Sequence, residues 1–149
     1  MSSEHELEIY RQFRTSQDKY GYFILAAVGA AIGFALTQTN GKALSYSQIP
    51  LGISLISWCL SFYFGCNHLN YVSSNMFANL ELLKVEKGRH PKAGNHPQVI
   101  KAASDGIRDA METNSKWSSR FARWQFQSFT FGGISYVVWH VLEMWMRVK

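Results

Sequence analysis

The sequence predicts an all-α integral membrane protein with three long helices, two or three of which span the bilayer. Three apolar segments carry this prediction, at residues 20–38, 49–66 and 124–146 of a 149-residue chain. Each reaches or approaches the ~20 residues that a helix needs to cross about 30 Å of hydrocarbon. Aromatic residues gather at the segment ends, where amphipathic rings favour the headgroup level. The alternative is a soluble helical bundle, but a bundle this small rarely needs helices that are apolar all round.

The first element combines a polar tail with an apolar span. Residues 1–19 are expected to form a cytoplasmic amphipathic helix that leads into the first span at residues 20–38, which contains no charged side chain. Small residues in this span recur four positions apart, a pattern that lets helix backbones approach closely in lipid. We expect them to pack against another helix, either of the same subunit or of a second one. These residues are Ala26, Ala30, Gly29 and Gly33.

The second element begins with the span at residues 49–66, which also lacks charged residues. Helical spacing continues beyond it, and Gly88 then ends the pattern with lysines in the preceding turn, as at a helix C-terminus. Polar side chains fall near one face of this helix, which in a bilayer must contact another helix or line water. We therefore expect either an inter-helix contact or a pore lining. The stripe consists of Ser54, Ser57, Ser61, His68, Asn75 and Asn79.

Residues 88–97 contain two prolines and two glycines and are expected to form a loop. The basic and imidazole side chains of this loop are either solvated or able to bind an anionic lipid headgroup or a small phosphorylated ligand. They are Arg89, His90, Lys92 and His96. Arg89 and His96 have six residues between them, and this spacing resembles the Arg–His motif of HEPN ribonucleases, in which the pair cleaves a phosphodiester. The resemblance implies a membrane-tethered ribonuclease, although the family motif lies on a helix and prolines and glycines surround both residues here.

The third element is predicted from Pro97 onward. A heptad pattern implies a helix seam packed against another helix, and its members are Ile100, Ala103, Ile107, Ala110, Asn114, Trp117, Phe121 and Trp124. Asn114 occupies an a-type position, where a buried amide either fixes register and oligomer number or tolerates a wet gap. The pattern continues into residues 124–146. This segment carries enough polar residues to lie in the membrane interface, but we expect it to cross.

Charge distribution predicts the topology. The three helices, at roughly 4–38, 49–87 and 97–146, leave residues 67–123 as an antiparallel helical hairpin. Of the 15 Lys and Arg residues, twelve lie in the N-terminal tail or in this hairpin. Basic segments stay on the cytoplasmic side, so we expect the N-terminus and the hairpin in the cytoplasm of a bacterium and the spans in its inner membrane. The 39–48 loop and the C-terminus should then lie outside.

The same observations narrow the function. Spans without charged residues argue against proton-coupled transport and voltage sensing, and no nucleotide-binding glycine loop, Ser–His–Asp arrangement or metal-ligand cluster is present. We expect no enzymatic activity, cofactor, metal ion or nucleic acid. A two-helix hairpin has little core of its own, which favours a homo-oligomer.

Two roles remain for such a chain, whose layout resembles that of small bacterial membrane effectors and pore subunits. One is a homo-oligomeric pore or membrane-perturbing protein that would transport ions. The other is a membrane-anchored adaptor whose hairpin docks a soluble partner. The expected partners are membrane lipids, further copies of the chain, and a cytoplasmic protein or a small anionic ligand.

Overall fold

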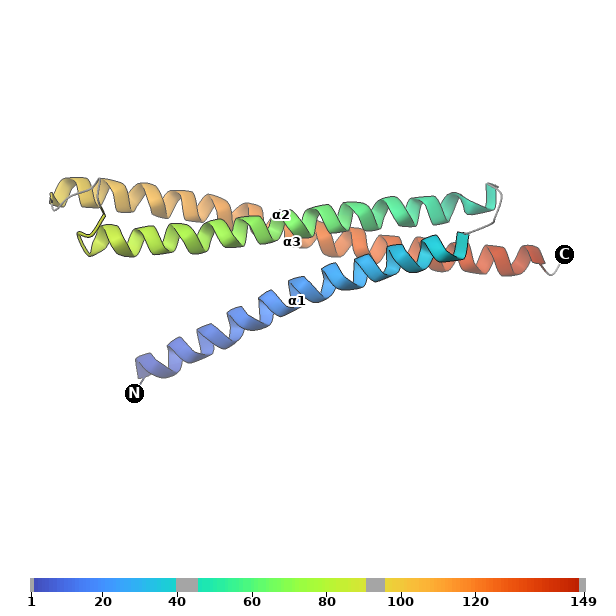
Figure 1. The fold of residues 1–149 in the computed structure, drawn as a ribbon, viewed down its shortest axis with the longest axis horizontal. Coiled ribbons are helices and arrows are strands. Elements are labelled where there is room, and N and C mark those ends of the chain that lie inside the picture. Colours follow the sequence, from blue (N-terminus) through green and yellow to red (C-terminus); the bar gives the residue numbers. More distant parts are fainter. Residues whose placement is uncertain (1, 40–45, 91–95, 148–149) are drawn as a thin grey trace. The chain divides into compact units, whose positions relative to one another are not determined.

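The computed structural model describes residues 2–39, 46–90 and 96–147, and these residues contain helices and no strands. Their order is α1 (Ser2–Thr39), the short 3-10 helix η1 (Tyr46–Gln48), α2 (Ile49–Glu86) and α3 (Pro97–Arg147) (Figure 1). The prediction of an all-α chain with three long helices is therefore confirmed for the described residues. Lys92 and most of the predicted 39–48 loop lie outside them.

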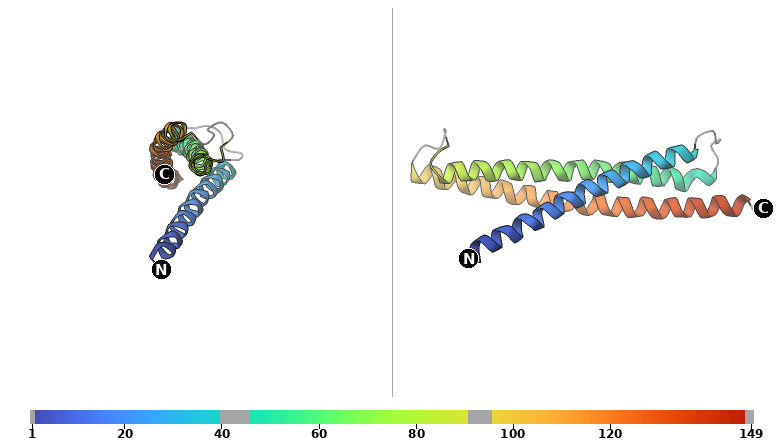
Figure 2. Two further views of the ribbon diagram at one scale, coloured as in Figure 1. Left: turned by 90° about the vertical axis from the view of Figure 1, so that its left-hand side faces the viewer. Right: turned by 60° about the horizontal axis from the view of Figure 1, so that its bottom comes forward.

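The chain divides into two compact units. Unit 1 comprises Met1–Gly65 and Arg123–Lys149, and unit 2 comprises Cys66–Ala122. Helices α2 and α3 each contribute one part to each unit. Within each unit these parts lie side by side and run in opposite directions (Figures 1 and 2). Unit 2 is thus an antiparallel pair of helices, and unit 1 adds α1 to a second such pair.

The end of α2 follows from one glycine. Gly88 has φ 63°, in the left-handed region that favours glycine. The Gly88 N–H donates to the Val85 carbonyl at 3.0 Å, and the Arg89 N–H donates to the Lys84 carbonyl at 2.9 Å. These two bonds form a Schellman motif, which satisfies carbonyls that the helix end would otherwise leave unpaired. The predicted helix C-terminus at Gly88 is confirmed.

Among the described residues, two stretches are long and apolar enough to cross a membrane, and they lie in Lys19–Thr39 and Tyr46–Glu86. They contain the first two predicted spans. Residues 124–146, the predicted third span, lie in neither stretch.

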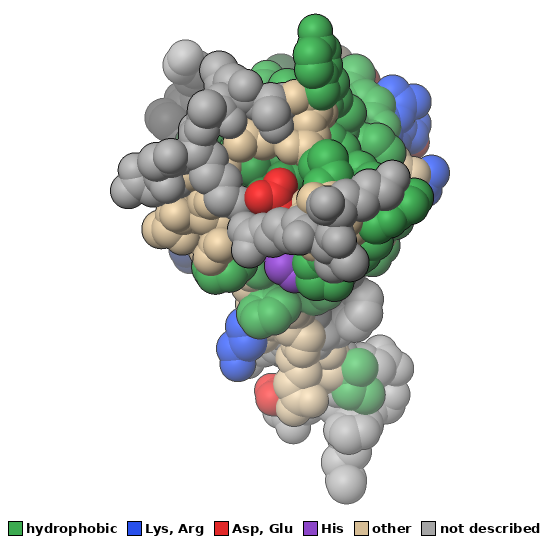
Figure 3. All heavy atoms as spheres, turned by 90° about the vertical axis from the view of Figure 1, so that its right-hand side faces the viewer, with side chains coloured by type: hydrophobic (Ala, Val, Ile, Leu, Met, Phe, Trp, Pro, Cys, Tyr) green, Lys and Arg blue, Asp and Glu red, His purple; other side chains and the backbone are tan. Residues whose placement is uncertain are grey.

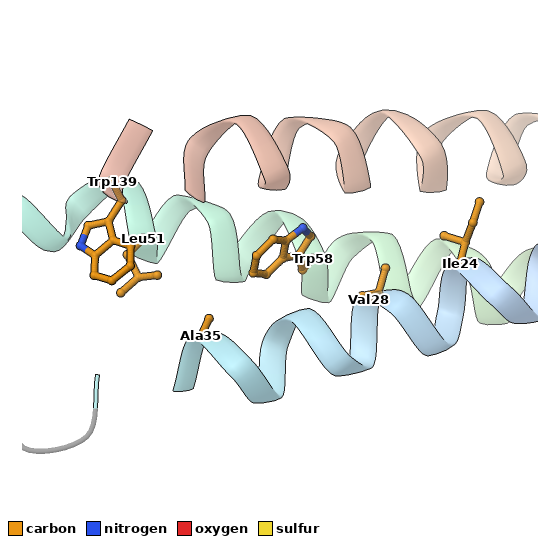
Figure 4. Packing of buried hydrophobic residues seen from close by; sticks show 6 residues of the cluster. All are labelled: Ile24, Val28, Ala35, Leu51, Trp58 and Trp139. Atoms are coloured by element: carbon orange, nitrogen blue, oxygen red, sulfur yellow. The ribbon is translucent and has the colours of Figure 1, made fainter. Parts of the chain in front are cut away.

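A hydrophobic cluster joins the three helices of unit 1. Figure 4 shows Ile24, Val28 and Ala35 pointing from α1 toward the other two helices. Trp58 on α2 and Trp139 on α3 complete the cluster together with Leu51. The ring of the partly buried Tyr136 lies 5.6 Å from Trp58 and 5.4 Å from Trp139. The cluster therefore fixes which face of α1 is turned inward.

Candidate functional site: the α2–α3 seam

The polar stripe of α2 meets α3 through hydrogen bonds to its backbone. In unit 1 the Ser54 hydroxyl donates to the Gly132 carbonyl at 2.8 Å. The Ser61 hydroxyl donates to the Gln125 carbonyl, also at 2.8 Å, and both serines are 0% exposed. The Trp58 indole N–H adds a bond of 3.3 Å to the Phe129 carbonyl between them. Three side chains of α2 thus bond to carbonyls on successive turns of α3, and together they fix the antiparallel register of the two helices.

The buried residues of α3 recur at intervals of seven or fourteen positions. They are Ser104, Ser118, Gln125, Gly132 and Trp139. The predicted seam agrees with this in part, since five of its eight members are half-buried, namely Ile100, Ala103, Ile107, Asn114 and Phe121. The other three members, Ala110, Trp117 and Trp124, are exposed. Small and polar residues, which lie one position after the large apolar ones, form the contact because they let the helix backbones come close.

Two glycines mark the closest approaches in unit 1. A Cβ atom on Gly132 would lie 2.5 Å from Cδ1 of Trp58 and 3.2 Å from the Ser54 carbonyl oxygen. A Cβ atom on Gly65 would lie 2.5 Å from Nε2 of Gln125. Neither position has room for a larger side chain unless a neighbour moves. The neighbouring Gly133, by contrast, has nothing within 4 Å of such an atom.

Gln125 is the most unusual residue of the seam. Its backbone carbonyl accepts the Ser61 hydroxyl, and its side chain is buried with 2% exposure. The Nε2 amide nitrogen has no hydrogen-bond partner among the described residues. A buried donor left unpaired costs about 1–3 kcal/mol, so this amide opposes the stability that the serine bonds provide.

The rest of the predicted stripe divides between the units. In unit 1 the Ser57 hydroxyl donates to the Ile53 carbonyl of its own helix at 2.8 Å. In unit 2 Nδ1 of His68 lies 3.0 Å from the Ser118 carbonyl oxygen and 2.9 Å from the Ser118 hydroxyl. Asn75 is half-buried and its Oδ1 atom has no partner among the described residues, whereas Asn79 is exposed. Three of the six residues, Ser54, Ser61 and His68, therefore bond to α3.

The small residues of α1 lie on the opposite side of that helix from the cluster. Ala26, Gly29, Ala30 and Gly33 are exposed. A Cβ atom on Gly29 or Gly33 would have nothing within 4 Å. Of the two expected contacts, the one within a single subunit is therefore not formed in unit 1.

Of the loop residues predicted to bind a ligand, the structure describes Arg89, His90 and His96. Arg89 and His96 are exposed and neither lies in a helix, unlike the motif of the HEPN family. Nε2 of His90 lies 3.6 Å from Oε2 of Glu81. Lys92 lies outside the described residues, and within them no group of three or more His, Cys, Asp or Glu side chains could hold a metal ion.

Several ion pairs lie on the exposed surface of unit 2. Arg108 bonds to Glu86 at 2.8 Å and joins α3 to α2, while Lys116 bonds to Glu112 at 2.7 Å within α3. The hydrogen bond from Lys116, and then its positive charge, lower the pKa of the Glu112 carboxyl from its usual value. These pairs are exposed and each contributes little to stability.

No protein-family model matches the chain, and no curated protein and no solved structure is significantly similar to it. The seam must therefore be interpreted from its own chemistry.

Sequence reasoning identified the serines of α2 but missed their partners. Gln125 and Gly132 lie among the polar and small residues for which the third segment was expected either to cross the membrane or to lie in its interface. The signal that could have identified them is the interval of seven between Gln125 and Gly132, which matches the interval between Ser54 and Ser61 on α2.

Proposed function

We propose that the chain is an integral membrane protein and that the apolar helical segments of unit 1, at residues 20–38, 49–65 and 124–146, lie within the bilayer. The observation that carries this proposal is the apolar surface of unit 1. Its interior holds Ser54, Ser57, Ser61 and Gln125 beside the hydrophobic cluster, while many large apolar side chains are exposed on its outside. Figure 3 shows hydrophobic side chains over much of the described surface at the end that carries the C-terminus. The exposed residues include Phe23, Ile56, Phe131, Ile134, Val137 and Trp145.

The solvent decides whether this arrangement is favourable. In water, a continuous apolar surface of this kind is a liability for a monomer. In lipid, apolar side chains face the hydrocarbon and polar groups must find partners inside the protein. The bonds from Ser54 and Ser61 to α3 carbonyls are of that internal kind. Residues 124–146 also follow this rule, since Gln125 and Gly132 are buried while Phe131 and Val138 are exposed.

The basic residues supply the proposed orientation. The N-terminal tail and unit 2 carry most of the Lys and Arg residues of the chain. Because basic segments stay on the cytoplasmic side, we propose that both lie on the cytoplasmic side of a bacterial inner membrane. The C-terminus then lies on the other side together with the 39–48 loop.

The open face of α1 supports self-association of the chain. Lipid provides no hydrophobic driving force between helices, so close packing of small residues is a main source of their affinity. The face formed by Ala26, Gly29, Ala30 and Gly33 is exposed and has room for a second backbone. We expect the Gly29→Leu, Gly33→Leu double variant to shift the protein toward monomers in native mass measurements. The Gly133→Leu variant, whose position is also open, should keep the oligomer; equal behaviour of the two variants would rule out this face.

Of the two roles, the membrane-anchored adaptor has the better support. The hydroxyls of Ser54 and Ser61 donate hydrogen bonds to carbonyl oxygens of α3, so they are not available to line a water-filled pore. Unit 2 instead exposes a row of apolar residues on α2 while Leu82 and Val85 are buried, which suits contact with a cytoplasmic protein. The exposed row consists of Met76, Phe77, Leu80 and Leu83.

A photo-crosslinking amino acid at position 77 tests the adaptor role in cells. We expect an adduct with a second protein whose yield falls in the Leu80→Glu variant, and no such adduct from the probe at position 119, where Ser119 is exposed. The same yield from both positions, or from the Leu80→Glu variant, would contradict docking on this row.

A pore remains the second candidate, because the polar interior of unit 1 provides a potential lining if α2 and α3 separate. Ion flux across liposomes that contain the unsubstituted chain distinguishes the roles. Flux would favour the pore, and its absence together with a specific adduct would favour the adaptor. The Ser61→Leu variant is unsuitable for this test, since it would disturb the seam itself.

A further inference from the structure

A row of three aromatic rings in unit 2 ends in an arginine. The rings of Tyr71 on α2 and Phe121 on α3 are stacked, with centroids 5.6 Å apart and planes at 18°. The Trp117 ring follows at 6.0 Å from Phe121. The Arg120 guanidinium carbon then lies 5.1 Å from the centroid of the Trp117 ring, within cation–π range. The row therefore joins a continuous aromatic surface to an oriented positive charge.

No ion pair joins Arg120 to a carboxylate within the part of the chain that the structure describes. The ion pairs found among the described residues of unit 2 use Glu81, Glu86 and Glu112, and none of them includes Arg120. The side chain is exposed. Its guanidinium carries five N–H donors in a planar fork, and a cation–π contact with one face of the group leaves these donors available to an oxyanion.

We propose that Arg120 and Trp117 bind the phosphate of an anionic lipid at the cytoplasmic surface of the membrane. This proposal rests on the proposed function, because it requires the apolar segment of α3, which begins four residues after Arg120, to lie in the bilayer. The planar guanidinium pairs with phosphate in a bidentate manner. Tryptophan rings favour the headgroup level, and the cytoplasmic leaflet is negatively charged.

The aromatic row favours a lipid over free phosphate. Trp117 is exposed, and Tyr71 and Phe121 are half-buried, so part of this ring surface is open to the glycerol and upper acyl carbons of a lipid. Inorganic phosphate has no apolar part that would use this surface. The combination of rings and guanidinium therefore fits an amphipathic ligand.

The test uses the full chain reconstituted in vesicles of phosphatidylcholine and phosphatidylglycerol. Native mass spectrometry after gentle release measures which lipid stays bound. We expect phosphatidylglycerol to be enriched on the unsubstituted chain. The enrichment of phosphatidylglycerol should be about fivefold lower on the Arg120→Gln variant than on the unsubstituted chain. This factor corresponds to about 1 kcal/mol for one basic residue at the membrane surface.

The matched control is Lys101→Gln, which removes one positive charge from an exposed position on the same helix, in the same unit. This variant should keep the enrichment. Equal losses in both variants would show diffuse attraction and overturn the proposal, as would unchanged enrichment in Arg120→Gln. Competition by inorganic phosphate as effective as competition by phosphatidylglycerol would assign the position to free anions instead.

Resistance to alkaline extraction from the same vesicles separates this inference from the proposed function. A chain that is extracted from the vesicles contradicts both. A chain that stays inserted without any lipid preference contradicts the lipid site alone. The Trp117→Leu variant should also lower the enrichment, because the guanidinium loses the ring that orients it.

Discussion

The Ser61 hydroxyl on α2 donates a 2.8 Å hydrogen bond to the Gln125 carbonyl oxygen on α3. Ser54, seven residues earlier on α2, makes the same bond to Gly132, seven residues later on α3. The equal intervals mean that one antiparallel register satisfies both bonds at once. A shift of either helix by one residue would break both and bring side chains into the space kept free at Gly132. The seam is therefore specified by two serines and the small residue opposite one of them.

Adjacent glycines provide a test of this close contact. A methyl group at position 132 would overlap the Trp58 ring, whereas position 133 is open. We expect Gly132→Ala to lower the free energy of unfolding by about 1–3 kcal/mol, as overpacking does. Gly133→Ala should be neutral or stabilising by up to about 1 kcal/mol, because alanine favours the helix. Thermal unfolding in detergent, followed by circular dichroism, measures both. Similar midpoints for the two variants would contradict the packing described for unit 1.

The serine bonds can be tested by deletion. Ser61→Ala removes the donor to α3, and we expect a loss of about 0.6–1 kcal/mol in unfolding free energy. Ser57→Ala is the control, since its hydroxyl donates to Ile53 within the same helix. The Ile53 carbonyl keeps its helical bond in that variant, so the effect should be smaller. A larger loss from Ser57→Ala would mean that Ser57, and not Ser61, holds the helices together.

The unpaired amide of Gln125 leads to an opposite expectation. Gln125→Met keeps the length of the side chain and removes the buried donor that has no partner. Unfolding free energy should stay unchanged or rise by about 1 kcal/mol, because the desolvation cost of the amide disappears. Gln127→Met, at an exposed position, should have no effect. A marked loss of stability in Gln125→Met would indicate that the amide finds a partner in the assembled protein.

The Glu112 carboxyl should titrate with a pKa below its usual value of 4.5. The main cause is the hydrogen bond from Lys116 to the ionised carboxylate, and the positive charge of Lys116 adds to it. Because the pKa of Glu112 is lowered, its pair with Lys116 stabilises the folded chain at pH values above the usual carboxyl pKa. This stabilisation is lost as the pH falls through the lowered pKa. Carboxyl titration by nuclear magnetic resonance measures this directly. Lys116→Gln should return the pKa toward 4.5; an unchanged titration would mean that the pair does not form in solution.

Sequence patterns predicted the helices well because local signals set them. The positive φ at Gly88 and the position of Pro97 at the start of α3 mark helix ends that any tertiary arrangement must respect. Part of the buried face of α3 was predicted one residue off. In unit 1, Trp124 was expected in the seam, whereas the contact uses the neighbouring Gln125. Where the surroundings are apolar, large residues face outward and small or polar ones pack inward, so hydrophobic spacing alone marks the wrong face.

Labelling of Cys59 tests the central claim, that the apolar helical segments of unit 1 lie in the bilayer. Cys59 is exposed on α2, so in a water-soluble protein it would react readily with a membrane-impermeant thiol reagent. The experiment uses the Cys66→Ser background in native membrane vesicles, and a Ser119→Cys variant of the Cys59→Ser, Cys66→Ser chain reports on unit 2. We predict that Cys59 stays unlabelled until detergent is added, while position 119 is labelled in inside-out vesicles without it. Labelling of Cys59 without detergent, at the rate found for position 119, would contradict the account.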